Sequence, residues 1–233
     1  MNMLRLIVTL ILVCTGLPIF GERILRDNIL KVEPGDFIVV SQNKSFTLLA
    51  FVAKEGPLLS IEEVSVPSNK VSSNINWGKW FLDGSKGNTC WIRYQLNVNS
   101  GQITNAFSLS QNCPITFSQE NNLLAKLILL DFKKIPLAER KRAGPQPAQG
   151  IADRRPVWQP RLMMDGHQID GVSFDGWRAR WPHDSSDLSG KLVEVYLPSD
   201  QGYVSYFPYW LEVQGMLGSA KVRIVDSGKG LKR

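Results

Sequence analysis

Residues that could carry out chemistry gather in two stretches of this 233-residue chain. The first stretch, NWGKWFLDGSKGNTCWIRY at 76–94, combines glycines, two lysines, a threonine and a cysteine, so it could hold a phosphate group or a reactive thiol. Its GSKGNT segment lacks the G-x-x-x-x-G-K-[ST] order, and no strand-then-helix frame surrounds it. A nucleotide site is therefore not predicted, and no cofactor is expected.

The cysteines of the chain are Cys14, Cys90 and Cys113. Cys14 lies in an N-terminal segment that we expect to be removed, which leaves Cys90 and Cys113. In an oxidising compartment an even pair forms a disulfide, whereas a redox pair would show C-x-x-C spacing. The sequence therefore predicts a Cys90–Cys113 disulfide, worth about 3 kcal/mol in the chain-entropy account.

The second stretch is FDGWRARWPHD at 174–184. If it is extended, Trp177 and Trp181 share one face, and Arg178 and Arg180 share the other. Two tryptophans four residues apart on one face could stack on a sugar, and two arginines could bind a carboxylate or phosphate. The competing interpretation places the tryptophans in the core and the arginines in solvent, because tryptophan is highly buried on average.

Catalytic arrangements are weakly indicated. The only histidines are His167 and His183, and the G-x-S-x-G sequence of a serine nucleophile is absent. The histidines have no zinc-ligand spacing, so no metal site is predicted. A pair of carboxylates for glycoside hydrolysis could come from five aspartates, although their DG and DSSD contexts are also typical of turns. These aspartates are Asp165, Asp170, Asp175, Asp184 and Asp187.

Basic residues concentrate in one segment, 133–155. They are Lys133, Lys134, Arg140, Lys141, Arg142, Arg154 and Arg155. Only Glu139 and Asp153 oppose them, so the segment carries a net +5, which equals the net charge of the chain without residues 1–21. The segment is either a solvated connector or a docking surface for an anionic lipid, a glycan or an acidic protein surface. Nucleic acid is not expected, because aromatic residues do not interleave with the charges.

The N-terminus has the layout of a secretory signal peptide, residues 1–21. Arg5 gives a positive start, an apolar run covers 6–13, and the first acidic residue is Glu22. A membrane-spanning helix needs about 20 apolar residues, and this run is interrupted from Thr15 onward. Export to the periplasm, the outer envelope or the medium is therefore expected. A retained anchor and lipidation of Cys14 are the alternatives.

Period-two patterns predict strands over most of the chain. Apolar runs at 37–40, 46–53 and 58–66, separated by turn compositions, predict an antiparallel meander. A hairpin is expected over 90–110. Short strands are then expected at 172–181, 191–198, 209–214 and 221–226.

One helix is expected near 120–130, where Ser118 could cap a run of leucines, with a buried strand at 127–132 as the alternative. Residues 143–160 hold four prolines and two glycines and are expected to form a linker. The predicted fold is mainly β, with antiparallel sheets in a sandwich or half-barrel. Its expected parts are a β-rich 22–142, the linker 143–160 and a β-rich 161–233.

Several longer segments resemble an uncharacterised group of exported proteins from chlamydia-related bacteria. They are the W…W…G…CW pattern before the hairpin, IPLAERKRAGP, DRRPVW, VSFDGWRARWP, LSGKLVEVY, FPYWLEV and KVRIVDSGK. The resemblance covers most of the chain after residue 21. It implies a bacterial envelope setting, and it assigns no activity and no functional residue.

The function expected from these patterns is that of an exported, non-enzymatic envelope protein that binds an anionic or lipidic partner, with contact at the membrane periphery as one form of it. One alternative is a hydrolase of an envelope polymer that uses acids and a histidine of the C-terminal half. The other is a periplasmic lipid carrier, which would need an apolar cavity above about 300 Å³.

Overall fold

A computed structural model describes residues 21–116, 122–200, 202–215 and 218–231. Its first half contains three short α-helices, one 3₁₀ turn and six strands. They are α1 (Ile24–Ile29), β1 (Phe37–Gln42), β2 (Ser45–Glu55), β3 (Leu58–Pro67), η1 (Ser68–Lys70), α2 (Trp77–Leu82), β4 (Cys90–Asn97), β5 (Ile103–Ser108), β6 (Cys113–Pro114) and α3 (Leu123–Leu127).

The rest of the described chain is built from strands. They are β7 (Lys133–Lys134), β8 (Leu162–Met164), β9 (His167–Ile169), β10 (Phe174–Arg180), β11 (Leu192–Pro198), β12 (Trp210–Gly215) and β13 (Gly218–Gly228), with the 3₁₀ turn η3 (Leu137–Glu139) after β7. The strands expected at 37–66, 90–110 and 172–226 are therefore confirmed. No helix in the described part of the chain has the length and apolar character needed to cross a membrane.

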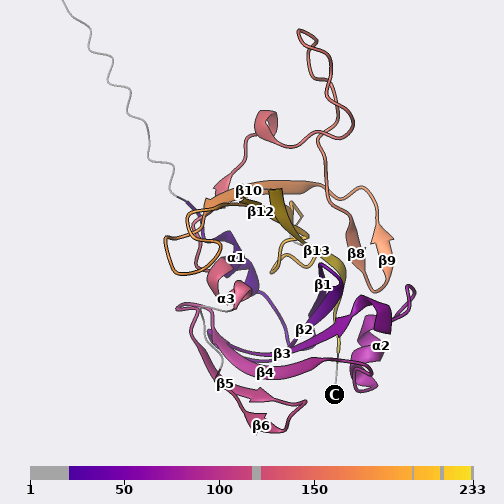
Figure 1. Cartoon of the computed structure of the whole chain (residues 1–233), viewed down its shortest axis with the longest axis vertical. Coiled ribbons are helices and arrows are strands. Elements are labelled where there is room, and N and C mark those ends of the chain that lie inside the picture. Colours follow the sequence, from indigo (N-terminus) through magenta and orange to yellow (C-terminus); the bar gives the residue numbers. More distant parts are fainter. Residues whose placement is uncertain (1–20, 117–121, 201, 216–217, 232–233) are drawn as a thin grey trace, which may run out of the picture.

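One antiparallel sheet of eleven strands runs through both halves of the chain. Its order is β6-β5-β4-β3-β2-β1-β13-β12-β11-β10-β7, and β8 and β9 form a separate hairpin. The sheet is open, because its end strands β6 and β7 do not pair with each other, and it curls around α1 and α3 (Figure 1). Both end strands are two residues long, which leaves little edge for pairing with another chain. The mainly β, antiparallel prediction is confirmed.

Alternation along the strands divides the core into two clusters. In β1, Ile38 belongs to the large cluster inside the curl, and Phe37 and Val39 belong to a smaller one on the other side. The smaller cluster is covered by α2, which contributes Trp77 and Phe81. In β10 the inner cluster takes Trp177 and Ala179, so the alternate residues Arg178 and Arg180 project to the other side of the sheet. These two arginines line the pocket described below.

The predicted helix near 120–130 is present but short. It begins after Asn122, whose side chain accepts a hydrogen bond from the Ala125 amide at 2.8 Å, and this capping fixes the first turn. Ser118, the expected cap, lies outside the described residues. After α3 the chain becomes extended, and Phe132 exchanges backbone hydrogen bonds with Glu22. A second and a third α-helix, α1 and α2, accompany it.

The predicted Cys90–Cys113 disulfide is wrong for this fold, since both cysteines are free. Cys90 begins β4 and Cys113 begins β6, and β5 lies between these strands. Strands two places apart in a sheet are separated by about 9–10 Å, whereas a disulfide requires Cα atoms within roughly 7 Å. Sequence spacing alone did not reveal the intervening strand.

Candidate functional site

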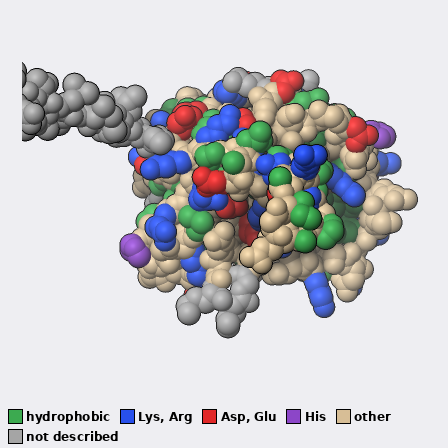
Figure 2. Space-filling view, turned by 90° about the horizontal axis from the view of Figure 1, so that it is seen from above, with side chains coloured by type: hydrophobic (Ala, Val, Ile, Leu, Met, Phe, Trp, Pro, Cys, Tyr) green, Lys and Arg blue, Asp and Glu red, His purple; other side chains and the backbone are tan. Residues whose placement is uncertain are grey.

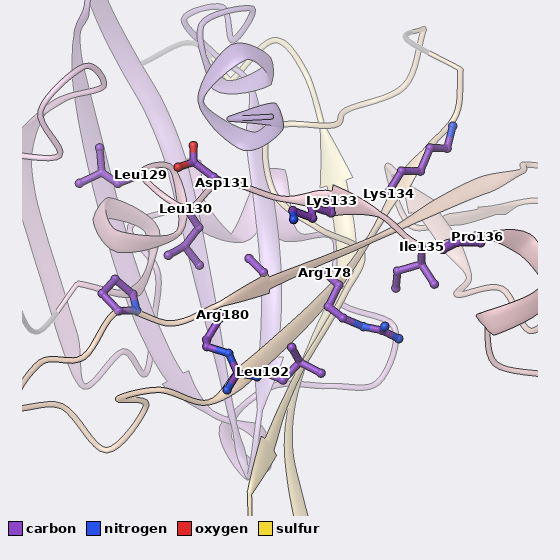
Figure 3. A pocket seen from close by; sticks show the side chains of 12 residues that line it. Leu129, Leu130, Asp131, Lys133, Lys134, Ile135, Pro136, Arg178, Arg180 and Leu192 are labelled. Carbon is purple, nitrogen blue, oxygen red and sulfur yellow. The ribbon is translucent and has the colours of Figure 1, made fainter. Parts of the chain in front are cut away.

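A pocket of about 640 Å³ lies beside β7 and β10, at the β7 edge of the sheet. It is lined by segments 129–131, 133–136 and 178–180, together with Pro182 and Leu192 (Figure 3). Figure 2 looks onto the top of the molecule as drawn in Figure 1, where basic side chains lie among hydrophobic ones. This pocket therefore brings together residues from the basic segment and from the FDGWRARW stretch, which the sequence keeps some forty positions apart.

Strand register explains why these cations meet. Lys133 in β7 lies directly opposite Arg178 in β10, and Arg180 is two positions further along the same strand. Residues opposite each other, and residues two apart, project from the same side of a sheet. Arg180 in turn lies opposite Leu192 in β11. One side of three neighbouring strands thus presents three cations and a leucine.

Two of the basic side chains in the pocket are neutralised by carboxylates. Arg178 forms ion pairs with Glu194 at 2.9 Å and Glu139 at 3.1 Å. Lys134 pairs with Asp175 at 2.9 Å. Burial lowers the pKa of Arg178, but hydrogen bonds to the two glutamates outweigh it and raise that pKa. These two cations consequently contribute more to structure than to ligand attraction.

Lys133 and Arg180 are left without a carboxylate. Both are exposed, and within the described residues neither takes part in an ion pair. The Arg180 side chain donates one hydrogen bond, to the Gly190 carbonyl at 2.8 Å, and the Lys133 side chain has no hydrogen bond to a described residue. Asp131, which also lines the pocket, is paired with Arg23 at 3.2 Å. The pocket therefore holds two cations whose charge no described acid offsets.

The apolar part of the lining was not found from the sequence. Leu129, Leu130, Ile135, Ala179 and Leu192 contribute to it. Leu129 and Leu130 belong to the leucine-rich run that was expected to continue the helix, and Ile135 follows the two-residue strand β7. Only the pairing of β7 with β10 places these residues beside the arginines, and no local pattern signals that pairing.

The other basic residues of 133–155 lie elsewhere. Residues 144–155 project from the body of the molecule without a helix or strand element (Figure 1), and Trp158 and Gln159 are back against the sheet. Arg140 is 9% exposed and donates to the carbonyls of Ile135 and Phe174 and to Asp175. Hydrogen bonds from Lys134 and Arg140 overcome the effect of burial and lower the pKa of Asp175. Arg140 thereby anchors the base of the projection.

Most of the basic side chains between residues 141 and 155 form ion pairs with nearby acids or donate hydrogen bonds to backbone carbonyls of the same segment. Lys141 pairs with Glu212, Arg142 donates to the Arg155 carbonyl at 2.9 Å, and Arg155 pairs with Asp153 at 2.8 Å. Arg154 is exposed, with no ion pair in the part of the chain that the structure describes. The basic segment is thus mostly an internally bonded connector, and only its first residues reach the pocket.

Trp177 and Trp181 are buried in the inner core, with 8% and 2% of their surface exposed. The Trp181 indole donates to Asp184 at 3.2 Å. Lys134 lies 5.8 Å from the centre of the Trp177 ring, on the rim of the sheet. This burial favours the interpretation in which both tryptophans belong to the hydrophobic core and do not form a sugar-binding surface.

The catalytic candidates do not assemble into one centre. Asp165 and His167 line a pocket of about 370 Å³ together with Asp226. However, Asp226 accepts hydrogen bonds from the backbone amides of Gly166 at 3.0 Å and Ser227 at 2.9 Å. It therefore ties the β8–β9 turn to β13, and burial raises its pKa.

The remaining candidates are distributed over other turns. Asp184 is bonded to Lys126, Ser186 and Trp181, and Asp170 accepts from Gln168 at 2.6 Å. Among the described residues, no three or more His, Cys, Asp or Glu side chains are grouped so that they could hold a metal ion.

One partly buried acid was not identified from the sequence. Glu63 of β3 lines a pocket of about 220 Å³ inside the curl, and it accepts a hydrogen bond from the Tyr94 hydroxyl at 3.3 Å. Asn122 donates to that hydroxyl at 3.2 Å. Burial raises the pKa of Glu63, and the Tyr94 bond offsets part of this. The signal was available, because alternation places Glu63 on the same face of β3 as the fully buried Ile61.

Replacing Glu63 by glutamine should stabilise the protein at high pH. A carboxyl whose pKa is raised in the folded state adds stability below its unfolded pKa and loses it as pH rises through the folded pKa. Glu63→Gln keeps an oxygen for Tyr94 and cannot ionise, so its free energy of unfolding should exceed that of the wild type at pH 8 and match it at pH 4. Urea unfolding at both pH values measures this. Exposed Glu55→Gln is the control, and equal effects of the two substitutions would contradict the burial argument.

Comparisons with known proteins give a family and a fold. Residues 47–170, just over half of the chain, match the family described as CT021 protein. A solved structure of the hypothetical protein CT021 from Chlamydia trachomatis is similar, with a TM-score of 0.59 and 18% identity over 88% of this chain and 92% of that one. At this identity the likeness shows the fold alone. No curated protein matches.

Proposed function

This chain belongs to the CT021 protein family, and from that premise we propose that it is an exported, non-enzymatic envelope protein whose pocket beside β7 and β10 binds an anionic lipid. The description of the family names no activity, so the chemistry has to come from the pocket. The observation that carries the proposal is the presence, in one pocket, of two cations without a carboxylate partner and an apolar lining.

The cations suit the head group of such a ligand. Lys133 and Arg180 are exposed at the pocket, so an anion can reach them without breaking an existing ion pair. Arginine binds phosphate or carboxylate oxygens through two parallel N–H groups, and lysine adds a compact point charge. A hydrogen bond to a charged group contributes about 1.5–3 kcal/mol. Arg178, held by its two glutamates, borders the same space.

The apolar lining suits an acyl chain. Leu129, Pro182 and Leu192 line the pocket and keep part of their surface exposed. Each acyl methylene that these side chains cover contributes about 0.8 kcal/mol. The volume of about 640 Å³ lies within the range of about 300–1,000 Å³ typical of ligand sites. A purely inorganic anion would leave most of this lining uncovered. An amphiphile uses both kinds of side chain at once.

Export is supported by the signal-peptide layout of residues 1–21 and by nothing in the pocket itself. A disulfide would have been a second argument for export, but Cys90 and Cys113 are both free. Fractionation of cells that express the full chain, followed by mass determination of the recovered protein, tests this part separately. Recovery of the uncleaved chain in the cytosol alone would overturn it.

Calorimetric titration tests the pocket with three probes: dodecyl phosphate below its micellar concentration, inorganic phosphate and dodecyl maltoside. Dodecyl phosphate should bind at least tenfold more tightly than either of the others, because only it carries both an anionic head and an apolar chain. Equal binding of the maltoside would show that charge plays no part. Equal binding of inorganic phosphate would show that the lining plays no part, and either result would overturn the proposal.

A further inference from the structure

A second pocket, of about 490 Å³, lies between β12–β13 and the segment 158–163. Its side chains combine indoles, guanidinium groups and an amide, from Trp158, Gln159, Arg161, Trp210 and Arg223. No aspartate or glutamate lines it among the described residues. None of these residues lines the pocket beside β7 and β10, so the two pockets are separate.

Neither arginine of this second pocket is paired with a carboxylate among the described residues. Arg161 and Arg223 are exposed, and the described part of the chain offers neither an ion pair nor a side-chain hydrogen bond. Arg223 lies directly opposite Trp210 across the β12–β13 ladder, which places its side chain beside the indole on one side of the sheet. Lys221 adds a third positive charge, 5.7 Å from the centre of the Trp210 ring.

The aromatic side chains are held in fixed positions. Trp158 and Trp210 meet edge to face, with ring centres 5.0 Å apart and ring planes at 67°. Trp158 also packs on Tyr196 at 5.3 Å, and its backbone amide donates to the Lys141 carbonyl at 2.8 Å. Both indoles remain partly exposed. They form a corner rather than a flat slot, so the site fits a puckered ring better than a planar base.

The amide of Gln159 has a defined orientation. Its Oε1 accepts a hydrogen bond from the Phe174 amide at 2.7 Å. Its Nε2 has no partner among the residues described, so it stays available as a donor to a hydroxyl oxygen. Because one end of the amide is fixed, the donor is oriented before a ligand arrives, which reduces the entropy cost of binding.

We propose that this pocket binds an anionic sugar, that is, a single sugar ring that carries a phosphate or a carboxylate. The two guanidinium groups take the anionic group, the indole corner covers the C–H surface of the ring, and Gln159 donates to a hydroxyl. The inference goes beyond lipid binding and does not depend on it, because different residues carry it.

Titration calorimetry with glucose 6-phosphate, glucuronate, glucose and inorganic phosphate tests the inference and separates the two anionic groups. Glucose 6-phosphate or glucuronate should bind at least tenfold more tightly than glucose and than inorganic phosphate. The tighter of the two anionic sugars identifies the group that the arginines take. Failure of both to bind, or affinity no better than that of phosphate alone, overturns the inference.

Variants assign the binding to this pocket. Arg161→Gln and Arg223→Gln should each weaken the better sugar at least tenfold, because each removes one charge-assisted contact. Lys133→Gln is the matched control and should leave sugar binding unchanged. Conversely, Arg223→Gln should leave dodecyl phosphate binding unchanged, so failure at one pocket is distinguishable from failure at the other. Sugar binding that survives both arginine substitutions overturns the assignment.

Discussion

A chain that carries both Lys133→Glu and Arg180→Glu should lose at least a hundredfold in affinity for dodecyl phosphate. Each substitution removes a charge-assisted contact and adds repulsion, and about 1.4 kcal/mol corresponds to a factor of ten. The single neutral variants Lys133→Gln and Arg180→Gln should each lose roughly tenfold. Calorimetry at fixed ionic strength measures these losses, and raising the salt concentration should weaken wild-type binding through screening.

The matched control is Arg154→Glu, which reverses a charge on the projecting segment away from the pocket. It changes net charge by the same amount as one of the pocket substitutions and should leave affinity within about twofold. Thermal unfolding of all variants shows whether the fold survives, which is expected because both pocket cations are exposed. If Arg154→Glu weakened binding as much as Lys133→Glu, attraction would come from overall charge and the pocket assignment would fail.

Trp181→Ala should reduce the free energy of unfolding by about 3–5 kcal/mol, the range for truncating a buried aromatic side chain. Trp181 is 2% exposed, and its removal leaves a cavity under β10 and takes a hydrogen bond from Asp184. Urea unfolding monitored by circular dichroism measures the change. Leu82→Ala, at a side chain that is 45% exposed, is the control and should cost under about 1 kcal/mol.

This result also decides the role of the FDGWRARW stretch. If Trp181→Ala left stability unchanged and abolished binding of glucose 6-phosphate, the tryptophans would be a ligand platform after all. Loss of stability in both Trp181→Ala and Trp177→Ala would assign them to the core, as their burial indicates.

Strands with strong local alternation were predictable. β4, for example, alternates between exposed or partly exposed positions and buried Ile92, Tyr94 and Leu96, and its period of two is visible in the sequence. The short helix α1 was not predicted, because its six residues carry no side-chain cap and no repeated apolar spacing. The early end of α3 was missed for a related reason, since a leucine-rich run suits a helix and a buried strand equally well.

The candidate sites were predictable only in part. Lys133, Lys134, Arg178 and Arg180 were selected from the sequence as anion-binding residues, in two unrelated groups. Their meeting depends on the pairing of β7 with β10, which has a register of only two residue pairs. The apolar lining, Glu63 and the pocket around Trp158 and Trp210 all depend on contacts between distant segments. The residue types in a sequence indicate which ligands could be bound, but long-range strand pairing determines which of these residues lie close together.

The position of β1 within the sheet has a consequence for how the chain reaches its native state. β1 lies between β2 and β13, and Phe37 is paired with Gly228. When the chain is synthesised, β13 is the last described strand to emerge, so the side of β1 that β13 covers has no partner until residues 218–228 have been made. Pairing across such a separation is slow, and an uncovered strand edge invites association with other chains. A holding factor that keeps the unfinished protein unfolded would remove this hazard, and it would matter most before β13 has been synthesised.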